Sequence, residues 1–280
     1  MSVDIKTFNS PKEAMEFLEN LALIDEDFIF RGQPSPNDKL STSLRRLTGA
    51  QEDKKVDDLL RRFEIALAKI GIFPFEKAGG KLDWLEYARH CGAPLPVIDF
   101  TYSPYIALFF AFNQMESNAD MDSFVTVLAL NARSLAKGWA KAANRAFGED
   151  DYLRFKNASE SQFDDGFKAG VLQLIPFPAK KNRRMLGQMG ALLYDTLDYR
   201  SLGFNDLEDF IASIDDSKNK NPALIKVNIH KSCAQSVFER LELMNITGSQ
   251  LFLNEYGAAM DAVNSYFYNS RIHFRDLDNR

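Results

Sequence analysis

The order of apolar and polar positions predicts helices and strands that alternate without a regular repeat. Apolar residues recur at helical spacing after Ser10 and within residues 51–70, 82–91, 105–112, 232–243 and 253–268. Short runs of apolar, β-branched and aromatic residues predict strands at 28–30, 97–100, 124–130, 171–176, 190–195 and 223–229. The alternation is too irregular for a doubly wound sheet, so the pattern predicts one α+β domain with inserted helices.

Capping residues mark several of the expected helix ends. Ser10 before Pro11 and Ser103 before Pro104 are N-cap signals, and Gly92 is suited to the position after a helix. Residues 131–170 are polar with weak periodicity, which indicates helical excursions or loop. Residues 202–221 are acidic and indicate a helix followed by a loop.

Composition narrows the class of protein without naming a function. The chain has 280 residues, 45% of them hydrophobic and 26% charged, with a formal net charge of −5. The negative charge argues against nucleic acid or an anionic membrane as a partner. No secretory signal pattern opens the chain, and no apolar run is long enough to cross a bilayer. We therefore expect a soluble protein in the reducing cytoplasm.

Residues and motifs that are typical of enzyme active sites are few in this sequence. Only three histidines and two cysteines occur, and none has metal-ligand spacing, so no metal is expected. His90 next to Cys91 is either a nucleophile pair or a helix end, and the second interpretation is favoured because helical neighbours do not face each other. The chain has no G-x-S-x-G elbow, P-loop or Rossmann glycine pattern. The 23 phenylalanines predict core more than a stacking platform.

Two constellations at strand ends could bind an anion. Arg31 follows an apolar strand, in a predicted turn with Gly32 and Gln33, and suits a planar clamp for phosphate or carboxylate. The alternative is a structural arginine bound to backbone carbonyls or to Asp99. A basic cluster at residues 180–184 could also contact phosphates, although a solvated loop explains it as well.

The second constellation extends from Asp99 to Pro104 and leads into a helix. The N–H groups and the positive dipole at a helix N-terminus attract anions, and the hydroxyls of Thr101 and Ser103 stand beside them. Capping of the helix by Ser103 explains the same residues without a ligand.

The sequence resembles the FRG-domain family, which is named for a Phe-Arg-Gly run present here as Phe30-Arg31-Gly32. The family's second block is matched at His90, Gly92, Pro94, Ile98, Asp99, Thr101, Ser103, Pro104, Ala107, Leu108, Phe110 and Ala111. Two later blocks are echoed at Arg184, Gln188, Gly190 and Leu192, and at Asn245-Ile246 and residues 251–257. The ordered blocks imply a single FRG-like domain over residues 1–280, with a motif-bearing core of about 28–263.

The departures from the family pattern cluster in the second block. Arg89 replaces a glutamine, Leu95-Pro96 replaces a Thr-Arg pair, and Phe100 replaces a tryptophan. Loss of the Thr-Arg pair removes polar groups from the expected wall of a site. We therefore expect that this protein binds a different ligand from other members of the family, or that it has kept only the family's fold.

A more distant similarity is to the R-S-E ADP-ribosyltransferases, which implies a mixed or antiparallel sheet core and NAD as substrate. Arg31 matches the arginine that holds NAD, and Thr101 and Ser103 match the turn that supports the pocket. The catalytic glutamate falls near Gln188, with Glu255 as a spare candidate. Glutamine cannot stabilise an oxocarbenium ion by charge, so this difference bears on catalysis more than on binding.

These resemblances lead to a hypothesis of an NAD- or nucleotide-binding domain. Its pocket residues would be Arg31, Gly32, Gln33, His90, Asp99, Thr101 and Ser103, with Gln188 and Glu255 as candidate catalytic residues. The enzymatic version transfers ADP-ribose or hydrolyses NAD, as a bacterial or prophage effector or defence protein acting on a protein target. The alternative is a non-catalytic module that binds a nucleotide or a protein.

Overall fold

The computed structural model describes residues 3–48, 56–75, 79–113, 123–163, 168, 170–175, 187–214 and 222–268. Within these residues the strands are β1 (Asp4–Phe8), β2 (Phe28–Gln33), β3 (Val97–Thr101), β4 (Phe124–Asn131), β5 (Leu172–Ile175), β6 (Gly190–Asp195) and β7 (Leu224–His230). The first helices are α1 (Pro11–Ile24), α2 (Ser43–Thr48), α3 (Val56–Lys69), α4 (Lys81–His90) and α5 (Pro104–Asn113). The later ones are α6 (Ala132–Ala142), α7 (Glu149–Lys156), α9 (Leu207–Ile214), α10 (Ala234–Leu243), α11 (Gly248–Phe252) and α12 (Glu255–Tyr268), with 3-10 turns at Glu160–Phe163 and Lys231–Cys233.

Among the described residues, seven strands form one mixed sheet in the order β1-β7-β4-β2-β3-β6-β5. Only the β1–β7 pair is parallel, and the other neighbours are antiparallel. Strands β2 and β4 pair over six positions and β3 and β6 over five, whereas β2 and β3 pair only at Phe30 and Thr101. The sheet therefore consists of two halves, β1-β7-β4-β2 and β3-β6-β5, that meet at a single point.

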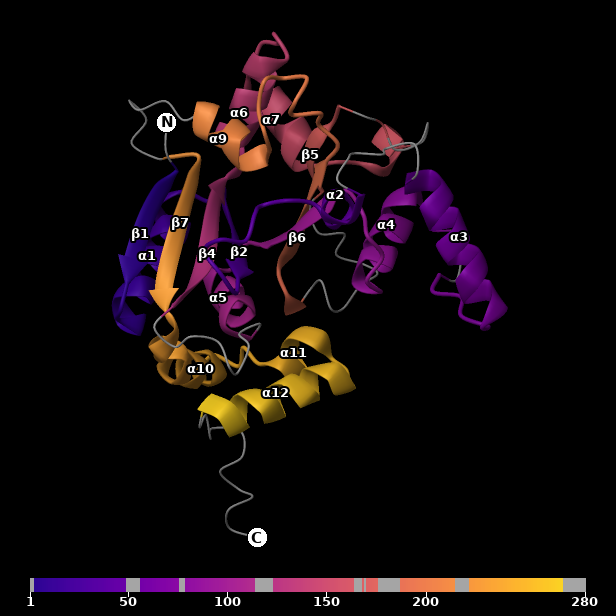
Figure 1. Cartoon of the computed structure of the whole chain (residues 1–280). Helices are drawn as coiled ribbons and strands as arrows, with labels where there is room; N and C mark the ends of the chain where they lie inside the picture. Colours follow the sequence, from indigo (N-terminus) through magenta and orange to yellow (C-terminus); the bar gives the residue numbers. More distant parts are fainter. Residues whose placement is uncertain are drawn as a thin grey trace.

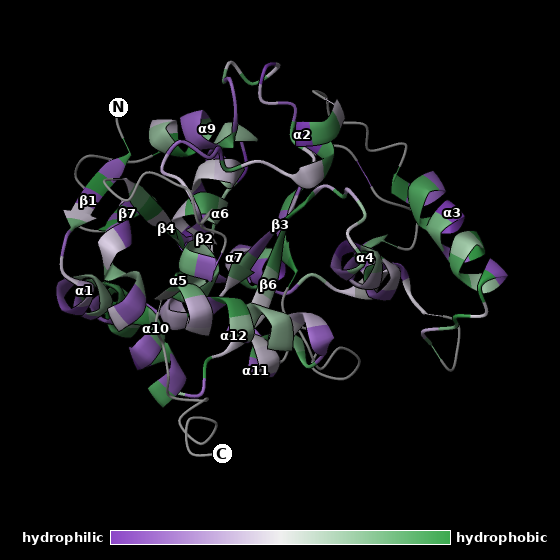
Figure 2. Ribbon diagram, turned by 60° about the horizontal axis from the view of Figure 1, so that its bottom comes forward, coloured by the Kyte–Doolittle hydropathy of each residue, from purple (hydrophilic) through white to green (hydrophobic). Residues whose placement is uncertain are grey.

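Helices cover both faces of the sheet (Figure 1). Helices α1, α5 and α10 pack on the face that carries Phe28, Phe30, Val127 and Val227, while α6, α7 and α9 pack on the face of Ile29 and Leu128. A third core joins α2, α3 and α4 to strands β3, β5 and β6. In Figure 2, α4 lies between these strands and α3, which lies at the edge of the molecule. The arrangement is α+β, as the sequence predicts.

The cap signals place several helices correctly. The Ser10 hydroxyl accepts a hydrogen bond from the Glu13 amide at 3.4 Å, and Pro11 opens α1. The Ser103 hydroxyl accepts one from the Ile106 amide at 3.4 Å, and Pro104 opens α5. Gly92 follows α4 with a φ of 90°, a left-handed conformation that glycine adopts without strain.

The structure corrects the predicted turn at Arg31. Strand β2 does not end at Phe30 but continues through Arg31 and Gly32 to Gln33, because β4 pairs with all three residues. Strand β1 at the sheet edge and the short helices α2 and α11 were not predicted. Residues 131–170, left open between helix and loop, contain α6 and α7. The basic cluster at 180–184 and the start of the helix expected from Gln51 lie outside the described residues.

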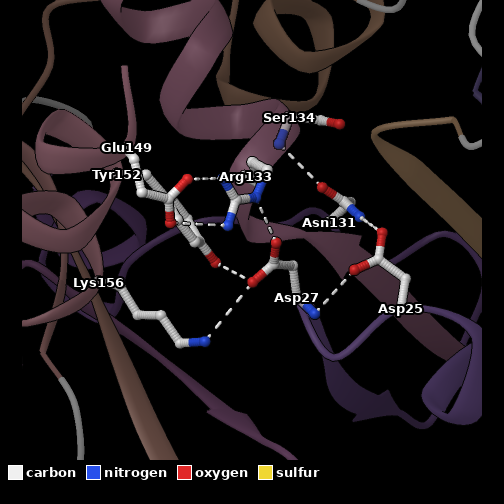
Figure 3. Close-up of polar contacts among 8 residues, drawn as sticks. All are labelled: Asp25, Asp27, Asn131, Arg133, Ser134, Glu149, Tyr152 and Lys156. Carbon is white, nitrogen blue, oxygen red and sulfur yellow. Dashed lines mark hydrogen bonds and ion pairs between the residues drawn. The ribbon is translucent and has the colours of Figure 1, made fainter. Parts of the chain in front are cut away.

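A network of charges fixes the beginning of β2 against α6 and α7 (Figure 3). The Asp27 side chain, 6% exposed, accepts hydrogen bonds from the Tyr152 hydroxyl and, at 2.6 Å, from Arg133 Nε. Lys156 Nζ lies 3.5 Å from the same carboxylate. Arg133 also contacts both oxygens of Glu149, at 2.7 and 3.2 Å, and its guanidinium stacks 4.0 Å above the Tyr152 ring.

Electrostatics within this network favour the ionised form of Asp27. Burial alone would raise the pKa of Asp27, but the hydrogen bonds from Tyr152 and Arg133 outweigh burial and lower that pKa. Among the ion-paired side chains, the two cations Arg133 and Lys156 thus balance the two carboxylates Asp27 and Glu149. We name this set of residues the Asp27 network.

The described helices include none that is both long enough and apolar enough to span a membrane.

Candidate functional site

A pocket of about 390 Å³ lies where the two halves of the sheet separate. Its walls include Phe30, Arg31 and Gly32 of β2, and Asp99, Phe100 and Thr101 of β3. Strand β6 adds Gly190, Ala191 and Leu192. The pocket forms because β2 and β3 pair at one position only, so that side chains rather than backbone ladder bonds fill the space beside that position.

Arg31 reaches from β2 toward β3 across this gap. Its Nη1 donates a hydrogen bond of 2.8 Å to the backbone carbonyl of Asp99 and lies 3.9 Å from the Asp99 carboxylate. Its Nε is buried and has no hydrogen-bond partner. Burial lowers the pKa of Arg31 and Asp99 opposes that effect, but an arginine stays protonated at neutral pH. The side chain thus makes the contacts of a structural arginine and keeps a free donor.

Asp99 holds two arginines beside the pocket. Arg89, at the end of α4, makes a two-point contact with the Asp99 carboxylate, one bond of which, from Nε, measures 3.2 Å. Burial alone would raise the pKa of Asp99, but Arg89 and Arg31 outweigh it and lower that pKa. Arg46 of α2, an exposed residue, also lines the pocket, as does His90. Among the described lining residues there are therefore three arginines and one carboxylate.

Arg89 is itself one of the departures from the FRG pattern, and it contacts Asp99. The chain lacks the arginine expected at position 96, and a guanidinium reaches Asp99 from position 89 instead. Arg89 therefore supplies a polar group to this part of the pocket although the Thr-Arg pair is absent.

The floor of the pocket ties β3 to the turn before β6. The Thr101 hydroxyl donates to the backbone carbonyl of Gln188 at 2.7 Å and accepts from the Ser103 amide at 3.1 Å. The Gln188 side chain lines the pocket, and its Nε2 donates to the Leu251 carbonyl at 3.1 Å. These two side chains therefore orient backbone segments from three elements around the cavity.

A further group of lining residues is apolar and comes largely from the C-terminal helices. Phe110 of α5, Phe252 of α11, and Tyr256 and Met260 of α12 form this group. The Phe252 ring makes edge contacts with Phe110, at 5.9 Å between centroids, and with Tyr256, at 5.3 Å. Figure 2 shows α11 and α12 next to each other at the end of the strands where β6 begins. The pocket thus has a cationic side and an aromatic side.

Gly32 is required by packing between β2 and α5. A Cβ atom at Gly32 would lie 2.0 Å from the carbonyl oxygen of Ala107 and 2.4 Å from the amide nitrogen of Ala111. Both are backbone atoms of α5, so they cannot move aside as a flexible side chain would. Gly32 permits a close backbone approach, as expected, but the approaching backbone belongs to the protein itself. Gln33 is buried and is not part of the pocket wall.

The structure does not bring every predicted site residue together. Arg31, Gly32, His90, Asp99, Thr101 and Gln188 line the pocket. Ser103 does not line it and is engaged in capping α5. Glu255 is exposed at the first position of α12, next to Tyr256 but outside the pocket wall.

Comparison with known families assigns part of the chain. The family model of the FRG domain matches residues 26–120. Residues 26–120 are therefore similar to an FRG domain. Comparison with curated proteins and with solved structures gives no match. The matched FRG stretch contains Arg31, Arg46, Arg89 and Asp99, so it supplies the cationic side of the pocket.

The aromatic side lies beyond the matched FRG stretch, apart from Phe110. Sequence reasoning did not assign Arg46, Arg89, Phe252, Tyr256 or Met260 to the site, because only the tertiary fold brings α2, α4, α11 and α12 to the same cavity. Arg89 had one signal, its departure from the family pattern next to His90. Within the described residues, no group of three or more His, Cys, Asp or Glu side chains could hold a metal.

Proposed function

We propose that this FRG-domain protein binds a nucleotide in the pocket between the two half-sheets, with NAD as the candidate from the sequence. The observation that supports the proposal is a set of three guanidinium groups beside one pocket in an acidic chain. Arginine binds phosphate through paired N–H donors, and Arg31, Arg46 and Arg89 line this pocket. The apolar lining residues suit the base or the sugar of the same ligand.

The size of the pocket favours one nucleotide unit. Small-molecule pockets range from roughly 300 to 1,000 Å³, and this one, at about 390 Å³, is near the lower end. We therefore expect AMP, or one half of NAD or ADP-ribose, to be enclosed. The second half of a dinucleotide would extend toward solvent past Arg46.

The arrangement supports binding more than catalysis. Asp99 is the one carboxylate among the described lining residues, and Arg89 and Arg31 already neutralise it. The Gln188 amide donates to a backbone carbonyl, and Glu255 lies outside the wall. A group that stabilises a positively charged transition state needs negative charge that is free to act. ADP-ribosyl transfer or NAD hydrolysis, with a protein target in the first case, is therefore the second candidate.

Ligand-induced stabilisation tests nucleotide binding. Thermal unfolding is followed with AMP, ADP-ribose and NAD, each at increasing concentration. A ligand at 100 times its dissociation constant stabilises a protein by about 2.7 kcal/mol, which raises Tm by several degrees in a chain of this length. Wild type should show this rise and Arg46→Ala should show less of it. Arg46 is exposed, so its replacement leaves the core intact.

A matched control separates pocket arginines from arginines in general. Arg62 lies on α3, is 76% exposed and pairs with Asp58 away from the pocket. Arg62→Ala should keep the full response to nucleotide. A wild-type protein whose Tm does not respond to any of the three ligands would remove the proposal.

Nicotinamide release distinguishes the enzyme from the binding module. The purified chain is incubated with NAD, and nicotinamide is measured beside a known NAD hydrolase. We expect binding of NAD without release. Release that Gln188→Ala abolishes would favour the enzymatic candidate.

A further inference from the structure

The two sides of the pocket differ in chemistry, and the aromatic side is built from parts that are held firmly together. Tyr256 and Met260 stand one turn apart on α12, and Phe252 ends α11. We propose that Tyr256 is the residue that binds the base of the ligand and so selects nucleotides over other phosphates. This inference rests on the proposed function and identifies the part of the pocket that determines its specificity.

Helices α11 and α12 form a close pair. Gly248 and Gly257 face each other so closely that a Cβ on Gly257 would lie 2.3 Å from the Gly248 carbonyl oxygen. The Asp261 carboxylate accepts hydrogen bonds from the amides of Gly248, at 2.6 Å, and Ser249, at 2.8 Å. One side chain of α12 thereby caps the first turn of α11. The relative orientation of Phe252 and Tyr256 is fixed by these contacts.

The helix pair is also attached to the rest of the pocket. Asn264 of α12 donates to the Asn113 side chain at the end of α5, at 3.0 Å, and Asn113 Nδ2 contacts the Met260 sulfur at 3.4 Å. On the other side, Gln188 donates to the Leu251 carbonyl. The wall therefore has a fixed position relative to the strands that carry Arg31 and Asp99, as a stacking platform requires.

Tyr256 has the geometry of a stacking residue. Its ring meets the Phe252 ring edge-on, with an interplanar angle of 87°, and the residue is 58% exposed. Phe252 thus supports the ring without covering it. Phe110 and Phe252 are packed into the core instead, in contact with each other. Of the three aromatic residues on this wall, Tyr256 is the one whose ring is free to receive a planar ligand.

The position of Tyr256 completes a two-part recognition of one ligand. The guanidinium groups of Arg31, Arg46 and Arg89 attract phosphate without distinguishing nucleotides from sugar phosphates. A base stacked on an aromatic side chain contributes about 1–3 kcal/mol, or roughly 5- to 150-fold in affinity. The arginines would thus determine that the ligand is an anion, and Tyr256 would determine that it carries an aromatic ring.

Isothermal titration of three variants with two ligands tests this division. AMP carries the base and ribose 5-phosphate lacks it, while both have the phosphate. For Tyr256→Ala we expect at least about tenfold weaker AMP binding and ribose 5-phosphate binding within about twofold of wild type. Tyr256→Phe should bind AMP like wild type. Tyr266→Ala is the matched control, because Tyr266 lies on the same helix, 82% exposed and away from the pocket wall.

The outcomes separate this inference from the proposed function. If wild type binds AMP and Tyr256→Ala binds it equally well, the base lies elsewhere and this inference fails while nucleotide binding stands. If Tyr256→Ala weakens both ligands equally, or Tyr256→Phe does not restore AMP binding, Tyr256 supports the pocket without selecting the base. If wild type binds neither ligand, the proposed function fails and this inference fails with it.

Discussion

Two clusters of charged residues flank the same strand, and they differ in how completely their charges are paired. The Asp27 network lies just before β2, and its carboxylate, 6% exposed, receives three partners from α6 and α7. The cluster at Arg31, within β2, lines a cavity. Its described lining residues include three arginines and one carboxylate, and a buried Arg31 Nε has no hydrogen-bond partner. Balanced charges connect elements of the fold, whereas an unbalanced cluster beside a cavity is suited to a charged ligand.

From this comparison we expect the first cluster to contribute to stability, and we propose that the second contributes to binding. The Asp27 network joins residues far apart in the sequence, and loss of its central carboxylate would leave the buried Tyr152 hydroxyl, and the partly exposed Arg133 and Lys156, without their shared partner. The Arg31 cluster is already incomplete, so the fold tolerates its imbalance. Variants at the two positions should therefore change different measured quantities.

Asp27→Ala should have the largest effect on stability. The buried Tyr152 hydroxyl loses its acceptor, which costs about 1–3 kcal/mol, and the partly exposed pairs with Arg133 and Lys156 are lost with it, so we expect about 3 kcal/mol. Urea unfolding measures the loss. Glu149→Ala is the control and should lose much less, since Glu149 is exposed. Equal losses for the two variants would contradict the central place of Asp27, as would weaker AMP binding by folded Asp27→Ala.

Gly32→Ala should have the second-largest effect on stability. The added methyl group would meet backbone atoms of α5 at 2.0 and 2.4 Å, and overpacking of this kind costs typically about 1–3 kcal/mol. Because α5 must shift, nucleotide binding should weaken in parallel with stability. A stable Gly32→Ala variant would show that α5 can move away from β2 at little cost.

The two clusters should also differ in how they make stability depend on pH, and we expect this effect to be smaller than those of the two substitutions above. The pKa of Asp27 is lowered in the folded state, so its contribution is present above the unfolded pKa, near 4, and is lost as pH falls through the folded pKa. The unfolding free energy of wild type should therefore fall as the pH drops below about 4. Asp27→Asn should show less of this fall, because it has no such contribution to lose.

Asp99→Asn provides a comparison for the same measurement of stability against pH. The pKa of Asp99 is also lowered, but its side chain is 43% exposed and solvent screens its ion pairs. Asp99→Asn should flatten the pH dependence less than Asp27→Asn does. The reverse order would contradict the assignment of stability to the Asp27 network.

Local signals in the sequence predicted much of the fold but only part of the site. Ser10 and Ser103 mark helix starts because a cap depends on residues three positions away. The prediction of a turn at Arg31 was wrong. Strand β2 continues past Arg31 because it pairs with β4, which lies almost a hundred residues later in the sequence. Strand β1 has few apolar residues since it lies at the sheet edge.

Nonlocal contacts explain what the sequence did not reveal about the charged clusters and the pocket. Asp27 accepts a hydrogen bond from Tyr152, which lies 125 positions later in the sequence, and no local sequence pattern predicts such a pair. Likewise, Tyr256 reaches the pocket only because α11 and α12 fold back beside Gln188. By contrast, Arg31, Asp99 and Thr101 lie on neighbouring strands and were recognised from their motifs. The cationic side of the pocket was therefore predictable in part, and the aromatic side was not.

The central claim is that the Arg31 cluster binds the phosphate of a nucleotide, and titration calorimetry with AMP, ADP-ribose and NAD tests it most directly. We expect wild type and Arg62→Ala to bind one ligand molecule per chain. Arg31→Ala should bind about tenfold to hundredfold more weakly, the loss of a hydrogen bond to a charged group, and Arg46→Ala should also bind more weakly without losing stability. Absence of binding to wild type, or equal affinity in wild type, Arg31→Ala and Arg46→Ala, would contradict the claim.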